Sequence, residues 1–424
     1  MRILFITGSP PHPTNIGGNQ LAAERIRALA SQGEVDLFLA VDERDLPPPH
    51  LAEIRKNFRL VGLIAPVRRG QRGPWSFFRP LAPGWIDRAA DYLASRRHDY
   101  RPDPRLAPAL KRLLAETRYD VVVGGGLDLA MKTGIAPDFP FVLDVNDTAQ
   151  EWFKSQIDNP SSRWLARRLA AWRLSQLKNF VPELYRQFRH CWVIKPRDVQ
   201  IPGLEHAVWL GMPYRQPEGG LPPLAPSDPA SRVAIMLGSY YHRPNAEGLD
   251  WFVRKVWPRV RAEVPDAEFR VIGPGLAARR AEAYGRVPGI RVLGTVPSVG
   301  PHYRECAFSI APIWIGAGIN IKVLESYAYG RTCVLTPFAY RGYEDCLEDG
   351  VSTCVAKRPD DFARACIGLL RDPARRDRLA AAGQPRAVRD FSFERFAGVV
   401  GATIQTVGKD SAEERGSRDD REFL

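Results

Sequence analysis

The chain has 424 residues, of which 45% are hydrophobic, and its formal net charge at pH 7 is +12. This length is too great for one ordinary domain and typical of two, and the hydrophobic content excludes a chain that is disordered throughout. No run of 18 apolar residues occurs, which excludes a membrane-spanning helix. The first residues, MRILFITGSPP, are typical of a buried strand and a turn rather than of a signal peptide, so a cytoplasmic protein is expected.

The cysteines and the charges narrow the classes of partner. Six cysteines form no CxxC pair, and five of them lie between Cys306 and Cys366, so reduced buried thiols are expected rather than a metal centre or disulfides. Residues 1–212 hold 30 Lys and Arg against 22 Asp and Glu, a balance of +8, and the remainder holds 30 against 26, a balance of +4. This excess favours a nucleotide diphosphate, a lipid pyrophosphate or an acidic membrane surface. Nucleic acid is not expected, because no recognised binding motif accompanies the charge.

The chain opens with a predicted strand–helix–strand unit. Arg2–Thr7 and Val35–Ala40 are predicted strands, and Gln20–Ser31 is an amphipathic helix between them, which indicates a parallel sheet. The loop before the helix is long and ends in Gly17 and Gly18. Long loops at this edge of a parallel sheet usually serve a ligand, although the two glycines could instead only permit a tight start of the helix.

Further strands are predicted at 60–64, 120–124 and 141–145, and the last of these leads into the sequence DVNDTAQEW. Asp144 and Asp147 therefore lie at the carboxyl end of a strand, where chemistry gathers in parallel sheets. Capping of the following helix by either aspartate is the alternative.

Two segments of the first half combine basic and aromatic residues. Residues 68–85, RRGQRGPWSFFRPLAPGW, are predicted to form an acceptor loop or a membrane contact, or else a loop whose aromatic side chains pack back on the domain. Residues 161–190 are mainly helical, with tryptophans and leucines on one side and arginines on much of the rest. Such a helix can lie on an anionic bilayer, but it more often packs on its own domain.

A second strand–helix series follows a Pro-rich linker. It has predicted strands at 233–237, 269–273, 290–293, 308–313 and 332–335. The predicted fold class is α/β, with two Rossmann-like doubly wound domains that face each other across a cleft. The expected division is an N-terminal domain 1–212 that is joined by the last helix at about 392–408, a linker 213–231, a C-terminal domain 232–391 and a disordered charged tail 409–424.

Residues 313–330, IWIGAGINIKVLESYAYG, have the features of an anion site. Gly316 and Gly318 let the backbone approach a ligand, and the following helix would direct its free N–H groups toward it. Lys322 and Glu325 are three residues apart and share one helix face, so Lys322 can meet a phosphate and Glu325 the hydroxyls of a sugar. A strand–turn–helix unit with a solvated Lys/Glu pair is the alternative. Gly238 and Ser239 follow another strand in the same way, with Arg243 as a further candidate cation.

These segments resemble the family 4 glycosyltransferases (glycosyl transferases group 1), which are retaining enzymes of the GT-B fold. The resemblance is carried by GAGINIKVLESYAYGRTCVLT, LGSYYHRPNAEGLDWFVRKVWP (237–258), FRVIGPG (269–275), IRVLGTV (290–296) and DFSFERFA (390–397), and it covers about residues 231–400. It implies that Val296 meets the base through its backbone and that Glu325 holds the ribose. The implied donor-binding set is Gly17, Gly18, Gly238, Ser239, Val296, Gly316, Ala317, Gly318, Ile319, Asn320 and Glu325.

The sequence departs from the family pattern in three places. Ser239 stands where an Arg is usual and Asn245 stands near the usual Lys, so Arg243 and Lys322 are expected to take over as countercharges of the leaving diphosphate. The paired glutamates of the family are eight residues apart, and Ala317 replaces the first, which normally touches the donor sugar. The usual His of the N-terminal domain is missing from YDVVVGGGLDLA, which leaves Asp144, Asp147 or His12 as candidates.

The resemblance implies transfer of a sugar from a nucleotide-diphosphate sugar, UDP- or GDP-linked, to a glycan or lipid-linked acceptor. The predicted catalytic residues are Lys322, Arg243 and Asp147. No Asp-x-Asp metal motif follows the strands, so no metal and no cofactor is expected. The place of work would be the cytoplasm or the inner face of a membrane, in polysaccharide biosynthesis. A donor-binding protein without catalysis and a nucleotide-sugar epimerase remain as alternatives.

Overall fold

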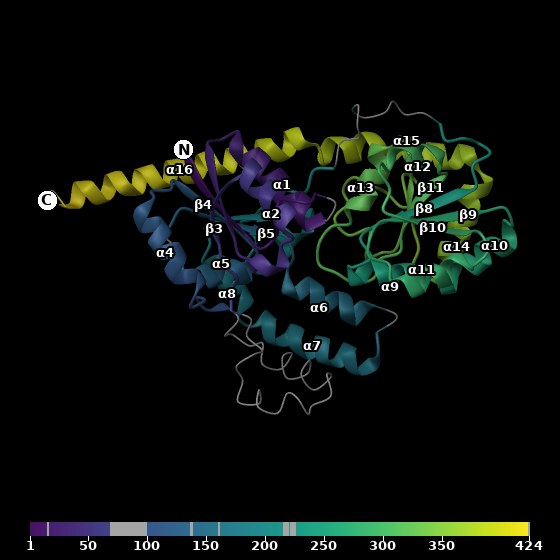
Figure 1. Cartoon of the computed structure of the whole chain (residues 1–424), viewed down its shortest axis with the longest axis horizontal. Helices are drawn as coiled ribbons and strands as arrows, with labels where there is room; N and C mark the ends of the chain where they lie inside the picture. The colour runs from purple at the N-terminus through teal and green to yellow at the C-terminus, as the bar shows by residue number, and fades with distance from the viewer. Residues whose placement is uncertain are drawn as a thin grey trace.

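The computed structural model describes residues 1–14, 17–67, 100–135, 139–159, 162–214, 220 and 226–422, with only the helical backbone of residues 411–422. The chain forms two lobes, each built on one parallel sheet with helices on both faces (Figure 1). The lobe that contains the first sheet is the N-terminal domain, and the other is the C-terminal domain. The predicted α/β class with two doubly wound sheets is confirmed.

The sheet of the N-terminal domain has seven strands in the order β3-β2-β1-β4-β5-β6-β7, and their pairings are parallel. Runs of valine, isoleucine and leucine form its centre, and Val121, Val122 and Val123 are fully buried because helices cover both faces. The strands are β1 (Arg2–Thr7), β2 (Glu34–Leu39), β3 (Arg59–Leu63), β4 (Val121–Gly125), β5 (Phe141–Val145), β6 (His190–Val193) and β7 (Val208–Trp209).

The helices of the N-terminal domain connect these strands. They are α1 (Gly17–Ala30), α2 (Pro48–Asn57), α4 (Leu106–Glu116), α5 (Leu127–Thr133), α6 (Ala149–Asp158), α7 (Trp164–Lys178) and α8 (Val181–Arg186), with short 3-10 turns η1 (Glu43–Asp45) and η4 (Pro196–Gln200). Chain order changes direction in the sheet between β1 and β4, where parallel sheets of this kind open a crevice for ligands.

The C-terminal domain repeats the design with six parallel strands in the order β10-β9-β8-β11-β12-β13. The strands are β8 (Val233–Leu237), β9 (Glu268–Ile272), β10 (Ile290–Gly294), β11 (Phe308–Ala311), β12 (Cys333–Leu335) and β13 (Cys354–Val355). The helical segments are α9 (Arg243–Trp251), the π-turn η5 (Phe252–Val256), α10 (Trp257–Glu263), α11 (Ala278–Gly285), α12 (Gly300–Glu305), α13 (Ile321–Ala328), α14 (Pro359–Arg371) and α15 (Pro373–Asp390).

The end of the chain forms three helices, α14, α15 and α16 (Phe393–Glu422). Asp372 separates the first two, because it ends α14 and caps α15 with a bond from the Arg375 N–H to Oδ1 at 2.8 Å. Helix α16 continues through most of the segment for which disorder is predicted. That segment lacks apolar periodicity, which is the signal that a sequence prediction uses, but helical backbone needs only a favourable start.

Helix α16 leaves the C-terminal domain and lies along the N-terminal domain, where the two chain ends are found (Figure 1). Its apolar residues Phe396, Val400 and Ile404 are buried in the same core as Ile3 and Phe5 of β1. The N-terminal domain is therefore built from both ends of the chain. None of the helices in the described part of the chain combines the length and apolar character that a membrane span requires.

Candidate active site

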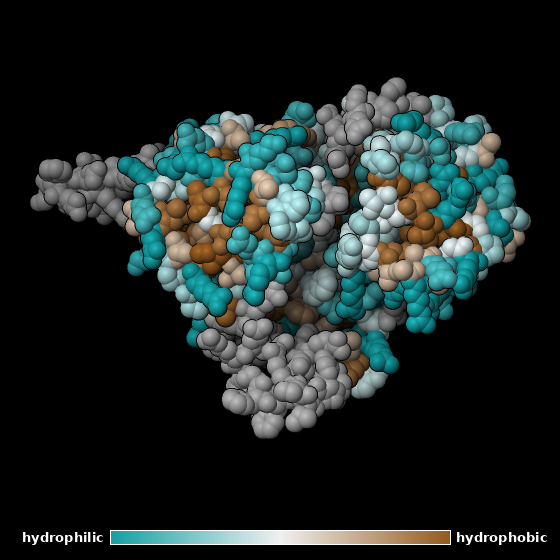
Figure 2. Space-filling view, in the orientation of Figure 1, coloured by the Kyte–Doolittle hydropathy of each residue, from teal (hydrophilic) through white to brown (hydrophobic). Residues whose placement is uncertain are grey.

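A cavity of about 810 Å³ lies where the carboxyl ends of the two sheets face each other, in the hollow between the lobes (Figure 2). Its walls come from the segments that follow β1, β5, β8, β10 and β11. The predicted donor-binding residues all line it: Gly17, Gly18, Gly238, Ser239, Val296, Gly316, Ala317, Gly318, Ile319, Asn320 and Glu325. The fold thus brings together residues that are more than 300 positions apart, such as Gly17 and Glu325, because the two sheets open toward each other.

The glycine-rich segment after β11 is shaped by contacts with the opposite domain. Gly316 has φ +142°, which favours glycine, and its N–H donates to Ser155 Oγ of α6 at 3.1 Å. A Cβ at Gly318 would lie 2.7 Å from Asp147 Oδ1, so only glycine lets this carboxylate approach the loop. One amide of the predicted anion loop is therefore already engaged by a hydroxyl group, and an aspartate stands beside the next glycine.

Lys322 lies on the cavity wall and is held by a short chain of polar contacts. Its Nζ donates to Asn245 Oδ1 at 2.9 Å, and Asn245 Nδ2 donates to the Ser239 carbonyl at 2.9 Å. Burial lowers the pKa of the Lys322 ammonium to about 8, against the opposing effect of nearby Cys333 and Glu325. The ammonium is thus a poorly solvated cation that gains from an anionic ligand.

Glu325 is half-buried on the same face of α13 as Lys322, and both side chains line the cavity. Behind it, Tyr303 and Tyr329 stack with ring centroids 4.6 Å apart, and Tyr329 also lines the cavity. Val296 follows β10 at the same end. Glu325, Val296 and an aromatic ring, that of Tyr329, therefore line the cavity together.

Arg243 is not placed where the sequence analysis expects it. It is the first residue of α9, its side chain is 64% exposed, and its Nε pairs with Glu247 Oε1 at 2.6 Å. It is not among the described residues that line the cavity, whereas His242, one residue earlier, is. The first turn of α9 directs consecutive side chains to different sides, so a shift of one residue exchanges a cavity position for a solvent position.

The two candidate aspartates after β5 have different environments. Asp144 is buried and forms a bidentate pair with Arg25, whose Nε and Nη2 donate to its two oxygens at 2.7 and 2.6 Å. Asp147 faces the cavity, and burial raises the pKa of its carboxyl, with Lys195 and His242 acting in the opposite direction. Neither aspartate caps α6, because Thr148 Oγ1 accepts the N–H of Glu151 at 3.3 Å. Both aspartates line the cavity, but Arg25 engages both oxygens of the buried Asp144, whereas Asp147 is exposed and is the aspartate more accessible to a ligand.

His12 does not join the site in the described structure. Its ring packs edge-on against His50 with centroids 5.2 Å apart, and it is not among the described cavity residues. The predicted aromatic and basic loop 68–85 lies outside the described residues.

Sequence reasoning missed Lys195, which follows β6. The side chain is only 5% exposed, its Nζ donates to the Ala317 carbonyl, and Nζ lies 3.4 Å from Asp198 Oδ1. Burial raises the pKa of Asp198 to about 6, although Lys195 acts to lower it. The sequence WVIKPRD could have indicated this residue, because a lysine directly after a buried strand is itself rarely buried unless it has a partner.

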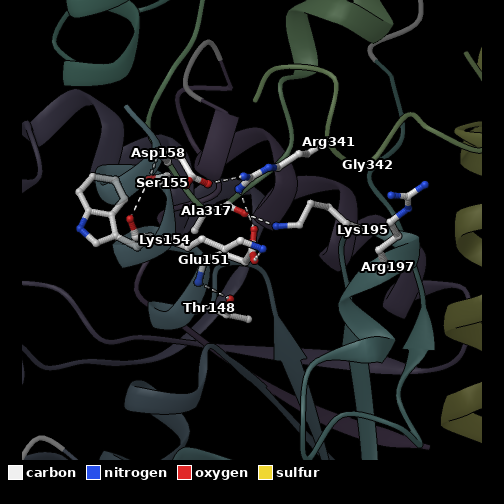
Figure 3. Close-up of polar contacts among 12 residues, drawn as sticks. Thr148, Glu151, Lys154, Ser155, Asp158, Lys195, Arg197, Ala317, Arg341 and Gly342 are labelled. Carbon is white, nitrogen blue, oxygen red and sulfur yellow. Dashed lines mark hydrogen bonds and ion pairs between the residues drawn. The ribbon is translucent and has the colours of Figure 1, made fainter. Parts of the chain in front are cut away.

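Further polar contacts hold α6 and η4 of the N-terminal domain against the C-terminal domain (Figure 3). Arg341 Nη1 and Nη2 lie 3.1 Å from Glu151 and 3.1 Å from Asp158, and Arg197 lies 3.8 Å from Glu344. Together with the Lys195 and Ser155 contacts they fix the glycine-rich segment relative to the N-terminal domain. The geometry of the cavity therefore depends on how the two domains meet.

Residues 231–372 match the family model described as "Glycosyl transferases group 1". No curated protein matches the chain. The likeness to solved structures extends over nearly the whole chain. A sucrose-phosphate synthase from Thermosynechococcus elongatus is 15% identical with a TM-score of 0.65, and the match covers 96% of this chain and 98% of that one.

Two further solved structures have the same architecture. Anabaena Alr3699/HepE, in complex with UDP and glucose, is 12% identical with a TM-score of 0.59 over 96% of this chain and 100% of that one. WaaG, a glycosyltransferase involved in lipopolysaccharide biosynthesis, is 14% identical with a TM-score of 0.57 over 94% and 99%. At these identities the likeness shows the fold, and the predicted GT-B arrangement is confirmed.

Proposed function

We propose that this chain, a glycosyltransferase by its group 1 domain at residues 231–372, moves a sugar from a nucleotide-diphosphate sugar to a glycan or lipid-linked acceptor, with retained anomeric configuration and without a metal ion. The observation that carries the proposal is the single cavity in which Lys322, Glu325 and two glycine-bearing segments of the C-terminal domain face Asp147 of the N-terminal domain. A cation, a hydroxyl acceptor and a second carboxylate are the groups that such a transfer needs.

Each end of the donor has a counterpart in the cavity. The diphosphate lies against the Gly238–Ser239 turn and the Lys322 ammonium, which Asn245 holds in position. The ribose hydroxyls bind Glu325, and the base lies near Val296 and Tyr329. Charge builds on the diphosphate as the bond to the anomeric carbon breaks, so Lys322 stabilises the transition state more than the bound donor. The protein supplies this positive charge itself, which is why no metal is invoked.

Asp147 is proposed to hold the donor sugar. The position where the resembling family has a glutamate is Ala317 in this chain, and the carboxylate of Asp147 lies beside the adjacent Gly318. The carboxylate of Asp147, from the N-terminal domain, thus lies next to Ala317, where the resembling family has a glutamate. Hydroxyl groups of the sugar would donate hydrogen bonds to this carboxylate. Burial raises the pKa of Asp147 because it removes water from the charged form, and the sugar hydroxyls would replace that water.

The test is a donor screen followed by turnover. UDP-, GDP-, ADP- and dTDP-sugars are compared by thermal shift, because a ligand that binds only the folded state raises its stability. Alr3699/HepE binds UDP and glucose, which makes UDP-glucose the first donor to examine. Product formation with labelled donor, unchanged by EDTA and with the donor's anomeric configuration by NMR, is the expected result. Binding without turnover would support the donor-binding alternative, and interconversion of the donor sugar would support an epimerase.

A lipid-linked acceptor is suggested by the exposed face of α7. Trp164 is 70% exposed and Leu165 54%, and Leu169 and Trp172 are each 39% exposed. Arg163 and Arg168 are exposed beside them, whereas Arg173, predicted on the solvated side, is buried. Tryptophan with arginine on one helix face is typical of attachment to an anionic bilayer, where each basic side chain contributes on the order of 1 kcal/mol.

We expect the protein to sediment with anionic liposomes at low salt, less at high salt, and much less after Trp164→Ser with Trp172→Ser. Val351→Ser removes an equally exposed apolar side chain from the C-terminal domain and is expected to change nothing. Equal recovery with neutral and anionic liposomes, or equal recovery of the double variant and the parent protein, would refute the membrane contact.

A further inference from the structure

His242 occupies the cavity position that the sequence analysis assigns to Arg243. It precedes α9 and lines the cavity between two groups from other elements, Lys322 of α13 and Asp147 of the loop after β5. The charged residues that follow it on α9 are Arg243 and Glu247, which pair with each other at 2.6 Å, and Asp250, which pairs with Arg254 at 2.8 Å. The imidazole therefore has one cationic neighbour, Lys322, and one anionic neighbour, Asp147. It is not part of the chain of hydrogen bonds that links Lys322 to Asn245 and Ser239.

Backbone hydrogen bonds hold the turn that carries this imidazole. The His242 N–H donates to the Ser239 carbonyl at 3.2 Å, and the His242 carbonyl accepts the N–H groups of Asn245 and Ala246 at 3.0 and 3.2 Å. Asn245 in turn holds Lys322 Nζ at 2.9 Å. Consequently the turn that carries His242 and the side chain of Lys322 are parts of one rigid assembly around the Gly238–Ser239 turn.

The surroundings of His242 favour the neutral imidazole while the cavity is empty. Burial lowers the pKa of His242 below its usual 6.5, the ammonium of Lys322 lowers it further, and Asp147 only partly opposes them. A diphosphate in the same cavity would bring negative charge within a few ångströms of the ring. Negative charge at such a distance favours the protonated form, so the direction of the shift reverses when an anion binds.

We infer that His242 takes up one proton when the diphosphate of a nucleotide sugar enters the cavity, and that it then acts with Lys322 as the second countercharge of the leaving group. This inference rests on the proposed function. The proton comes from solvent onto a ring nitrogen of His242, where it donates to a diphosphate oxygen, and it returns to solvent when the nucleoside diphosphate leaves. No bond of the chain is made or broken in this cycle.

The pH dependence follows from the two cations. Donor binding raises the pKa of His242, so affinity is greatest at low pH and declines as pH rises through the value in the complex. Lys322, with a pKa of about 8 in the empty cavity, adds a second decline at higher pH. Asp147 also faces the ring, and burial raises the pKa of its carboxyl, so its effect is measured separately with Asp147→Asn.

The experiment measures protons taken up on binding. Titration calorimetry with UDP-glucose and GDP-mannose is run at pH 7 in two buffers of different ionisation enthalpy. These donors are suitable because both phosphates of a nucleotide sugar are esterified and do not titrate near neutral pH. The variants are His242→Gln, His242→Arg and, as a matched control on another helix of the same domain, His302→Gln.

We expect His242→Gln to bind donor about tenfold more weakly, the loss of one charge-assisted hydrogen bond, and to lose most of the proton uptake. His242→Arg is expected to recover the affinity without the proton uptake, because an arginine is already charged. His302→Gln should match the parent protein in both respects. A merely structural role of His242 would not separate affinity from proton uptake in this way.

Two failures can be told apart. Donor binding by the parent protein with unchanged affinity and proton uptake in His242→Gln would overturn the inference and leave the proposed function intact. Absence of binding by the parent protein to any of the UDP-, GDP-, ADP- and dTDP-sugars would overturn the proposed function itself. Recovery of binding by His242→Arg guards against a folding defect in the glutamine variant.

Discussion

Replacement of Lys322 by alanine is expected to lower kcat by about 10²- to 10³-fold, the usual effect of removing one preorganised group that stabilises developing charge. The dissociation constant of the donor should change much less, because the charge on the leaving diphosphate is larger in the transition state than in the bound donor. The kcat/KM of the parent enzyme should also fall as pH rises through about 8, because burial lowers the pKa of the Lys322 ammonium to about 8 in the empty cavity. The alanine variant should lack this limb of the pH profile.

The measurement is steady-state turnover with labelled donor from pH 6 to 9, together with donor affinity by calorimetry. Lys255→Ala removes an exposed lysine of the same domain and should leave turnover unchanged. Arg243→Gln should also have little effect, because Arg243 pairs with Glu247 in solvent. If Lys322→Ala raises the Michaelis constant and leaves kcat unchanged, Lys322 only binds the donor, and the stabilisation of the leaving group must come from another residue.

Replacement of Glu325 by alanine is expected to weaken donor binding while the fold stays intact. The carboxylate accepts hydrogen bonds from two hydroxyls in the proposed complex, and a lost hydrogen bond to a charged group costs roughly 1.5–3 kcal/mol, or about 10- to 150-fold in affinity. Glu325→Gln keeps one acceptor oxygen and should lose less. Titration calorimetry and a thermal unfolding curve for each variant separate binding from stability.

Glu282→Ala is a suitable control, since this exposed glutamate of the same domain pairs with Arg286 on the surface and is not among the described cavity residues. Unchanged donor affinity in Glu325→Ala would remove Glu325 from the site. Equal loss in the two variants would indicate a general effect of charge on the domain rather than a contact with the ribose.

Local patterns predict most of the fold. The strand predicted at Arg2–Thr7 is β1, and the strands predicted at 141–145 and 233–237 are β5 and β8, because uninterrupted β-branched and apolar runs between turns leave few alternatives. The sequence also predicts the glycine-bearing turns after β8 and β11. In the second of these turns the glycine has a structural reason, because Gly316 has φ +142°.

Contacts between distant segments account for what the sequence concealed. The sequence places both Asp144 and Asp147 at the end of a strand, and it does not show that Arg25, 119 residues from Asp144, engages the Asp144 carboxylate. Whether His242 or Arg243 faces the cavity depends on the residue at which α9 begins. Helix propensity predicts such a boundary only within a few residues. Lys195 donates a hydrogen bond to the carbonyl of Ala317, 122 residues away, and a periodic sequence pattern cannot predict such a contact.

Helix α16 sets an order of events during synthesis. The strands of the N-terminal domain leave the ribosome first, yet Phe396, Val400 and Ile404, which complete the core around Ile3 and Phe5, are made after the whole C-terminal domain. At about 5–20 residues per second, the roughly 190 intervening residues take on the order of 10–40 s. Throughout that interval α1 and α2 cover only part of this face of the first sheet, and the apolar surface that α16 later buries is available to chaperones. The C-terminal domain can thus fold on the ribosome before the N-terminal domain is complete.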